Sequence, residues 1–112
     1  MKRYDKLKQN WEFRRLYGRG KCLHTQAFIL YYIKGKSGRV RLGITAGKKI
    51  GSAVKRNRAK RVVTAAFDSV CPNIKKGYDF VLVAREQILS YKSTAVGNML
   101  AQVLAANDLM RQ

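Results

Sequence analysis

The fold is decided by residues 52–72, which read SAVKRNRAKRVVTAAFDSVCP. Ser52 is a good helix N-cap, and Pro72 with Asn73 marks the end of the helix. Between them the apolar residues recur at helical spacing and form one stripe, made of Ala59, Val62, Val63, Ala66, Phe67 and Val70. Such a stripe has to be buried against another layer, so the sequence predicts a long helix packed on a sheet.

Three apolar runs supply that sheet. Residues 27–33 are rich in β-branched and aromatic side chains and predict a strand. After a Gly-containing turn at 35–38, residues 40–44 alternate between apolar and other side chains, and we expect these two strands to form an antiparallel hairpin. Residues 78–84 are apolar almost throughout, which is typical of a strand buried on both faces.

Two further helices complete the predicted order α-β-β-α-β-α. Asn10 can cap a short helix over residues 10–18, and Ser93 or Thr94 can cap the last helix. The apolar side of the last helix consists of Val96, Met99, Leu100, Val103 and Leu104. The sequence therefore predicts an α+β sandwich, a single domain over residues 1–112 with helices on a mixed sheet.

Composition limits the class of protein. With 46% apolar residues and one proline in 112, the chain is expected to fold rather than to be disordered. No apolar run approaches the roughly 20 residues of a membrane span, and the charged start at Met1 lacks the apolar region of a secretory signal. Cys22 and Cys71 are isolated, with only His24 as a further ligand, so we expect no zinc site and a reducing, cytoplasmic location.

Positive charge is concentrated in the first two thirds of the chain. The formal net charge is +18, and the segment between Glu12 and Asp68 carries fifteen lysines and arginines without a single acid. Residues 68–112 are close to balance, with five basic and four acidic residues. Charge alone permits three partners, namely nucleic acid, an anionic membrane or an acidic protein.

The densest group of cations lies around the start of the long helix, where residues 48–61 hold seven of them. The partial positive charge of a helix N-terminus makes each cation in the first turn unfavourable by about 0.3–1 kcal/mol. The same arrangement suits phosphates, and Asn57 adds a group that can hydrogen-bond a ribose or a base. A solubilising face normally mixes charges and a membrane-surface helix needs bulky apolar residues, so nucleic acid is favoured.

Aromatic residues suggest a second surface. Phe13 and Tyr17 are four residues apart on the first helix and point the same way, and Tyr31 lies on the first strand. If this helix crosses the open face of the sheet, the three rings can border a groove that stacks unpaired bases. Composition alone favours the other reading, in which all three are core residues. Trp11 is expected to pack inside.

Residues 53–61, preceded by Lys48, Lys49, Ile50 and Gly51, resemble the Arg-Asn-Arg motif of the bacterial ribonuclease P protein subunit. The resemblance extends almost from end to end: Leu7, Phe13, Tyr17 and Gly20 match the family's first segment, Phe28, Ile29 and Tyr31 its first strand, and residues 79–85 its last strand.

The resemblance implies a small basic protein that joins a large catalytic RNA, one to one, and assists removal of the 5′ leader from precursor tRNA. The chemistry is implied to belong to the RNA and its Mg²⁺, so the protein is expected to hold no catalytic residue, metal or cofactor. A left-handed βαβ crossover, as in one domain of a small-subunit ribosomal protein, is implied against the usual rule. The implied RNA-binding residues are Lys48, Lys49, Arg56, Asn57, Arg58, Lys60 and Arg61, and the implied leader-binding cleft consists of Phe13, Tyr17, Ile29 and Tyr31.

Two other functions fit parts of the sequence. A protein-only nuclease needs clustered carboxylates for its metal ions, but the six acidic residues are scattered. A structural ribosomal-RNA-binding protein has the same size and charge, yet it has no need of a groove for a single strand. The aromatic groove is therefore the feature that separates these alternatives.

Overall fold

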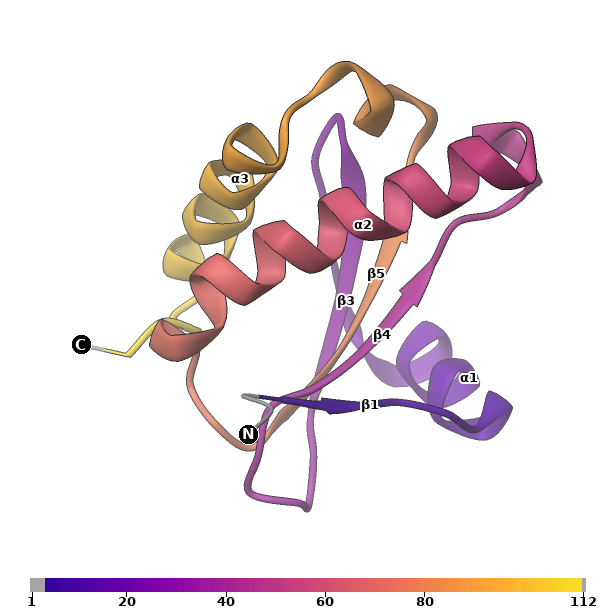
Figure 1. Cartoon of the computed structure of the whole chain (residues 1–112). Helices are drawn as coiled ribbons and strands as arrows, with labels where there is room; N and C mark the ends of the chain where they lie inside the picture. Colours follow the sequence, from indigo (N-terminus) through magenta and orange to yellow (C-terminus); the bar gives the residue numbers. More distant parts are fainter. Residues whose placement is uncertain (1–3, 112) are drawn as a thin grey trace.

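The computed structural model describes residues 4–111. A five-stranded sheet carries three α-helices (Figure 1). The strands are β1 (Asp5–Lys6), β2 (Lys21–His24), β3 (Phe28–Lys34), β4 (Arg41–Thr45) and β5 (Tyr78–Ala84). The helices are α1 (Asn10–Arg19), α2 (Ala53–Val70) and α3 (Ser93–Ala106), with short 3-10 helices η1 (Lys48–Ile50), η2 (Cys71–Asn73) and η3 (Glu86–Ser90).

The sheet is mixed, in the order β1-β4-β5-β3-β2. β5 is antiparallel to β3 and parallel to β4, which confirms the predicted mixed sheet. The predicted hairpin between β3 and β4 is wrong, because β5 lies between them. The apolar side chains of β5 need cover on both faces and a strand on each side, so this strand takes the centre of the sheet.

The β4–α2–β5 connection joins two neighbouring parallel strands. Seen with α2 in front of the sheet and the strands pointing upwards, β5 lies to the left of β4, so the crossover is left-handed (Figure 1). This agrees with the fold implied by the resemblance and differs from the usual right-handed crossover.

Helices cover the two faces of the sheet unequally. The main core lies between the sheet and the pair α2 and α3, where Phe28, Phe67 and Phe80 are fully buried. On the other face α1 packs alone, with Leu16 against Val81 and Leu7 in a smaller cluster. The upper part of this second face is not covered by α1 (Figure 1).

Most helix limits agree with the sequence. Ser52 caps α2 as predicted, because its hydroxyl accepts a hydrogen bond from the Lys55 amide at 3.4 Å. The other two predicted caps are one or two residues late, since Gln9 precedes α1 and Lys92 precedes α3.

Two short edge strands, β1 and β2, were not predicted. Met1–Arg3, on which the expectation about a secretory signal partly depends, lie outside the described residues. Between Tyr4 and Arg111, no helix has both the length and the apolar character needed to cross a bilayer.

Candidate nucleic-acid interface

The predicted RNA-binding residues lie close together in the chain, in η1 and at the start of α2, and are here called the basic face. η1 presents Lys48 and Lys49, and the first three turns of α2 present the remainder. Every member is exposed to solvent except Arg56, which is partly buried. The basic face consists of Lys48, Lys49, Arg56, Asn57, Arg58, Lys60 and Arg61.

The charges of the basic face have no carboxylate partner among the described residues. The five ion pairs of this part of the chain all use other cations, namely Arg15, Arg39, Arg41 and Lys75. Asp68, the acid on α2 itself, interacts with Tyr4 instead: burial, followed by the interaction with Asp68, raises the pKa of the Tyr4 hydroxyl. The positive end of α2 is therefore left for an external anion.

Arg56 differs from the other cations because it braces the turn before α2. Its Nε donates to the Gly51 carbonyl at 3.0 Å. Gly51 has φ +127°, a conformation that side-chain-bearing residues rarely adopt, and the Lys55 side chain lies against it. Arg56 thus holds the shape of the loop that presents Lys48 and Lys49, and its contact with RNA remains a prediction.

The four predicted leader-binding residues share the other face of the sheet and are called the aromatic surface: Phe13, Tyr17, Ile29 and Tyr31. The rings of Tyr17 and Tyr31 meet edge to face with centroids 5.0 Å apart. Tyr17 is 44% exposed, and the other three side chains are only partly buried. The composition-based expectation of three core residues is wrong for Tyr17.

The edge strand β2 adds two polar side chains beside this surface. Cys22 lies opposite Tyr31 in the β2–β3 register, and His24 lies opposite Ile29. Burial, followed by the contact with Cys22, raises the pKa of the Tyr31 hydroxyl. No local pattern in the sequence indicates these neighbours, because strand β2 is short and mostly exposed.

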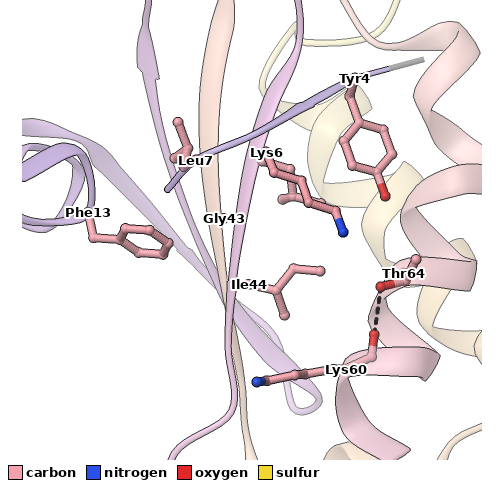
Figure 2. Close-up of a pocket in the computed structure, with 9 residues that line it drawn as sticks. Tyr4, Lys6, Leu7, Phe13, Gly43, Ile44, Lys60 and Thr64 are labelled. Carbon is pink, nitrogen blue, oxygen red and sulfur yellow. Dashed lines mark hydrogen bonds between the residues drawn. The ribbon is translucent and has the colours of Figure 1, made fainter. Parts of the chain in front are cut away.

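A hollow of about 290 Å³ lies at the free edge of β4 and joins the two surfaces (Figure 2). Lys60 and Thr64 of α2 border it on one side, and Phe13 of α1 lies on the other. β1 contributes Lys6, a cation that sequence analysis did not select. β1 pairs with β4 only as far as Leu42, so the edge of β4 beyond that point is open to the hollow.

The ring of Phe13 rests directly on Gly43. A Cβ atom on Gly43 would stand 2.5 Å from Phe13 Cζ, closer than any real contact, so only glycine allows the ring to lie there. This close approach joins α1 to β4 and could not be seen from the sequence, in which the two residues are thirty positions apart.

We expect Gly43→Ala to destabilise the protein by about 1–3 kcal/mol, because the added methyl group overpacks the site and displaces the Phe13 ring. Urea unfolding measures the change. Gly47→Ala is the matched control, since a Cβ there meets nothing within 4 Å. The double variant Gly43→Ala/Phe13→Leu should recover most of the loss, and an unchanged midpoint for Gly43→Ala would contradict this packing.

Trp11 is not a core residue, contrary to expectation, because its side chain is 63% exposed. It lies on the outer side of α1, where the ring makes no aromatic contact with another described residue. No group of three or more Cys, His, Asp or Glu side chains within residues 4–111 is placed to hold a metal ion.

Comparison with known proteins gives a consistent result. The Ribonuclease P family profile matches residues 1–107. The ribonuclease P protein component of Clostridium novyi is 39% identical over 89 residues, which cover 78% of this chain and 79% of that protein. That of Oceanobacillus iheyensis is 33% identical over 112 residues, which cover 99% and 93%.

Solved structures agree in fold over most of the chain. The RNase P protein of Staphylococcus aureus superposes with a TM-score of 0.81 at 29% identity, covering 95% of this chain and 97% of that one. The protein from Thermotoga maritima gives 0.78 at 29% identity, covering 89% and 94%. The matches favour ribonuclease P over the structural ribosomal-RNA-binding alternative. The chain belongs to the family of bacterial ribonuclease P protein components.

Proposed function

We propose that this chain binds the catalytic RNA of ribonuclease P through its basic face and the 5′ leader of precursor tRNA through its aromatic surface. In this assembly the protein assists endonucleolytic removal of the leader, which leaves the mature 5′ end of the tRNA. We further propose a one-to-one complex with the RNA and a cytoplasmic location, where the precursor is made.

The observation that carries the proposal is the hollow shared by the two surfaces. Lys60 of the basic face and Phe13 of the aromatic surface border the same space (Figure 2). A folded RNA held by the cations and a single strand stacked on the rings would therefore meet at one place. This arrangement suits a substrate whose leader leaves a structured RNA at the cleavage point.

The acids of the chain support the proposal that the RNA carries the chemistry. Glu12 and Asp79 are both paired with guanidinium groups. Among the described residues, no three acidic, His or Cys side chains gather to hold a metal ion. In our proposal Mg²⁺ enters with the RNA, and the protein contributes binding and orientation.

Tyr31→Ala is expected to weaken binding of the holoenzyme to precursor tRNA with a long leader by roughly five- to a hundredfold, since one stacked base contributes about 1–3 kcal/mol. Binding of mature tRNA, which has no leader, should stay unchanged. Equilibrium binding of both substrates to the reconstituted holoenzyme measures the two values.

Tyr91→Ala serves as the control, because Tyr91 lies in the loop before α3 and its hydroxyl bonds to Gln26 instead. If Tyr31→Ala weakens binding of precursor tRNA and of mature tRNA equally, the aromatic surface does not bind the leader. The proposed role of the basic face would not be affected by this result.

A further inference from the structure

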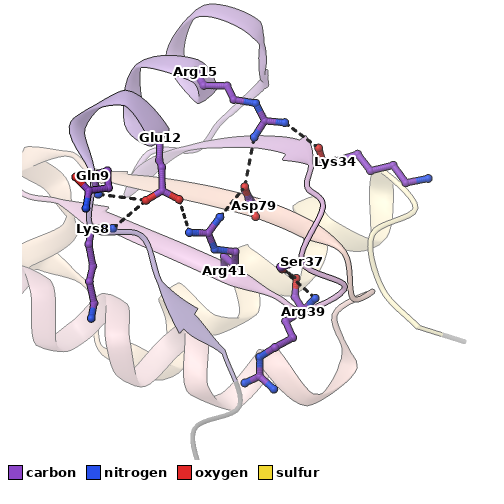
Figure 3. Close-up of polar contacts among 9 residues, drawn as sticks. All are labelled: Lys8, Gln9, Glu12, Arg15, Lys34, Ser37, Arg39, Arg41 and Asp79. Carbon is purple, nitrogen blue, oxygen red and sulfur yellow. Dashed lines mark hydrogen bonds and ion pairs between the residues drawn. The ribbon is translucent and has the colours of Figure 1, made fainter.

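α1 presents different side chains on its two flanks. Phe13 and Tyr17 lie on the flank that borders the aromatic surface, whereas Glu12 and Arg15 lie on the opposite flank and reach down to the sheet (Figure 3). Residues three or four apart share a side of a helix, which explains both pairs. The position of the rings over the sheet therefore depends on what Glu12 and Arg15 contact.

Glu12 and Arg15 belong to a chain of ion pairs, here called the anchor network, that also includes Arg41 of β4 and Asp79 of β5. Arg41 pairs with Glu12 and lies 3.6 Å from the Asp79 carboxylate. Arg15 lies 3.4 Å from the same Asp79 oxygen and donates to the Lys34 carbonyl at 3.2 Å. Two series of ion pairs thus connect α1 to the sheet, one through Arg15 and one through Glu12 and Arg41, and both end on the Asp79 carboxylate (Figure 3).

The carboxylates of this network are buried. Glu12 is 6% and Asp79 2% exposed, and they are the buried charged residues of the described part of the chain. Charged residues are seldom buried unless they are paired. Replacing a buried ion pair by apolar residues of similar volume often leaves the stability of a protein unchanged or raises it. Here two buried acids pair with two arginines, and the four residues come from α1, β4 and β5. This arrangement indicates that the position of α1 on the sheet is fixed for a reason other than stability alone.

Asp79 provides a rigid base for the network. It lies in the central strand, with Ile33 opposite on β3 and Arg41 opposite on β4. Gly35 closes over it, since a Cβ there would stand 2.6 Å from Oδ1. Oδ1 is buried and has no hydrogen-bond partner among the described residues, so the carboxylate is held by packing and by the two arginines on Oδ2.

Hydrogen bonds favour the charged form of the second acid, Glu12, whereas burial raises the pKa of Asp79 above its usual value. Burial acts to raise the pKa of Glu12, but hydrogen bonds from the Gln9 amide and the Arg41 guanidinium outweigh it and lower the pKa below its usual value. The Gln9 amide lies 3.2 Å from the Glu12 carboxylate. Glu12 therefore fixes the first turn of α1 and the sheet contact at the same time.

We propose that the anchor network is a positioning device, in which Glu12, Arg15, Arg41 and Asp79 set the height of α1 so that Phe13 and Tyr17 stand correctly opposite Tyr31. These four residues are positioning residues, which act on the leader through the rings. The inference rests on the proposed function of the aromatic surface. It assigns leader affinity to residues on the flank of α1 that does not face the leader.

The test uses Arg15→Met, which removes the ion pair between Arg15 and Asp79. Glu12→Gln is a milder variant, and Arg15→Lys is the conservative variant expected to restore binding. We expect Arg15→Met to weaken holoenzyme binding of long-leader precursor tRNA by roughly tenfold, about the value of one stacked base. Affinity for mature tRNA and for the catalytic RNA should stay within twofold. Arg15→Lys should recover at least half of the loss.

A spectroscopic readout separates positioning from stability. Trp11 is the single tryptophan, lies on α1 next to Glu12 and is exposed, so its fluorescence anisotropy reports the motion of this helix. Arg15→Met and Glu12→Gln should lower the anisotropy, and Arg15→Lys should restore it. Val96→Ala is the control, because it opens a cavity in the main core beneath α3 and leaves α1 untouched.

Two results would overturn the inference. The first is that Val96→Ala and Arg15→Met lower the melting temperature by the same amount and also weaken leader binding by the same factor. The other is a destabilised Arg15→Met protein that keeps its full preference for the long leader while Tyr31→Ala loses it. If Tyr31→Ala and Arg15→Met both leave that preference intact, the proposed leader function fails together with this inference.

Discussion

The double variant Arg58→Ala/Arg61→Ala is expected to bind the catalytic RNA roughly a hundredfold more weakly. Both side chains are exposed on α2 and neither has a carboxylate partner among the described residues. Each lost contact with a phosphate removes about 1.5 kcal/mol or more, and two such losses multiply to this factor.

The salt dependence should change in parallel. Counterion release makes the logarithm of the binding constant fall linearly with the logarithm of salt concentration, by about 0.7–0.9 per neutralised phosphate. Binding of the variant and of the unchanged protein, titrated between low and physiological salt, should therefore give slopes that differ by roughly 1.4–1.8.

The matched control removes two positive charges elsewhere. Lys76→Ala/Lys92→Ala has the same net charge as the arginine variant, and both lysines are exposed and lie outside the basic face. We expect this control to lose less than threefold in affinity. Equal losses for the two double variants would show that total charge matters and that the positive end of α2 has no special role.

Phe67→Ala is expected to destabilise the protein by about 3–5 kcal/mol, a large share of the roughly 5–15 kcal/mol of a typical domain. The ring is fully buried where three elements meet, with its centroid 5.0 Å from that of Tyr4 and 6.1 Å from that of Phe80. Truncation leaves a cavity that α2 cannot fill without moving.

Urea unfolding followed by circular dichroism measures this loss. Phe67→Leu, which retains most of the volume, should lose less than half as much. RNA binding by the folded fraction of Phe67→Ala should remain, since the basic face is mostly exposed and lies in η1 and the first three turns of α2, before Phe67. A loss below about 1 kcal/mol would contradict the central role given to this ring.

Elements defined by local patterns were predicted well. The apolar stripe of α2, its Ser52 cap and the extent of β5 follow from spacing within a single segment. The partners of the strands do not, because pairing depends on residues far apart in the chain. The turn at Gly35 to Gly38 resembles a hairpin turn, yet β3 and β4 are separated by β5, which comes forty residues later.

The candidate site divides in the same way. The basic face was predicted from charge, since an uncompensated run of cations is visible in the sequence itself. The aromatic surface came from the resemblance, because the exposure of Tyr17 depends on how α1 lies on the sheet. The anchor network was not predicted: Glu12 and Asp79 meet Arg41 only after α1, β4 and β5 have assembled.

The central place of β5 has a consequence for synthesis on the ribosome. β3 and β4 leave the exit tunnel first, but neither has its main neighbour until residues 78–84 emerge. A sheet that depends on so distant a segment closes late, and its unpaired strands stay open meanwhile. β3 and β4 therefore stay without their main neighbour until most of the chain has been made, and the domain can close only after α2 has left the tunnel.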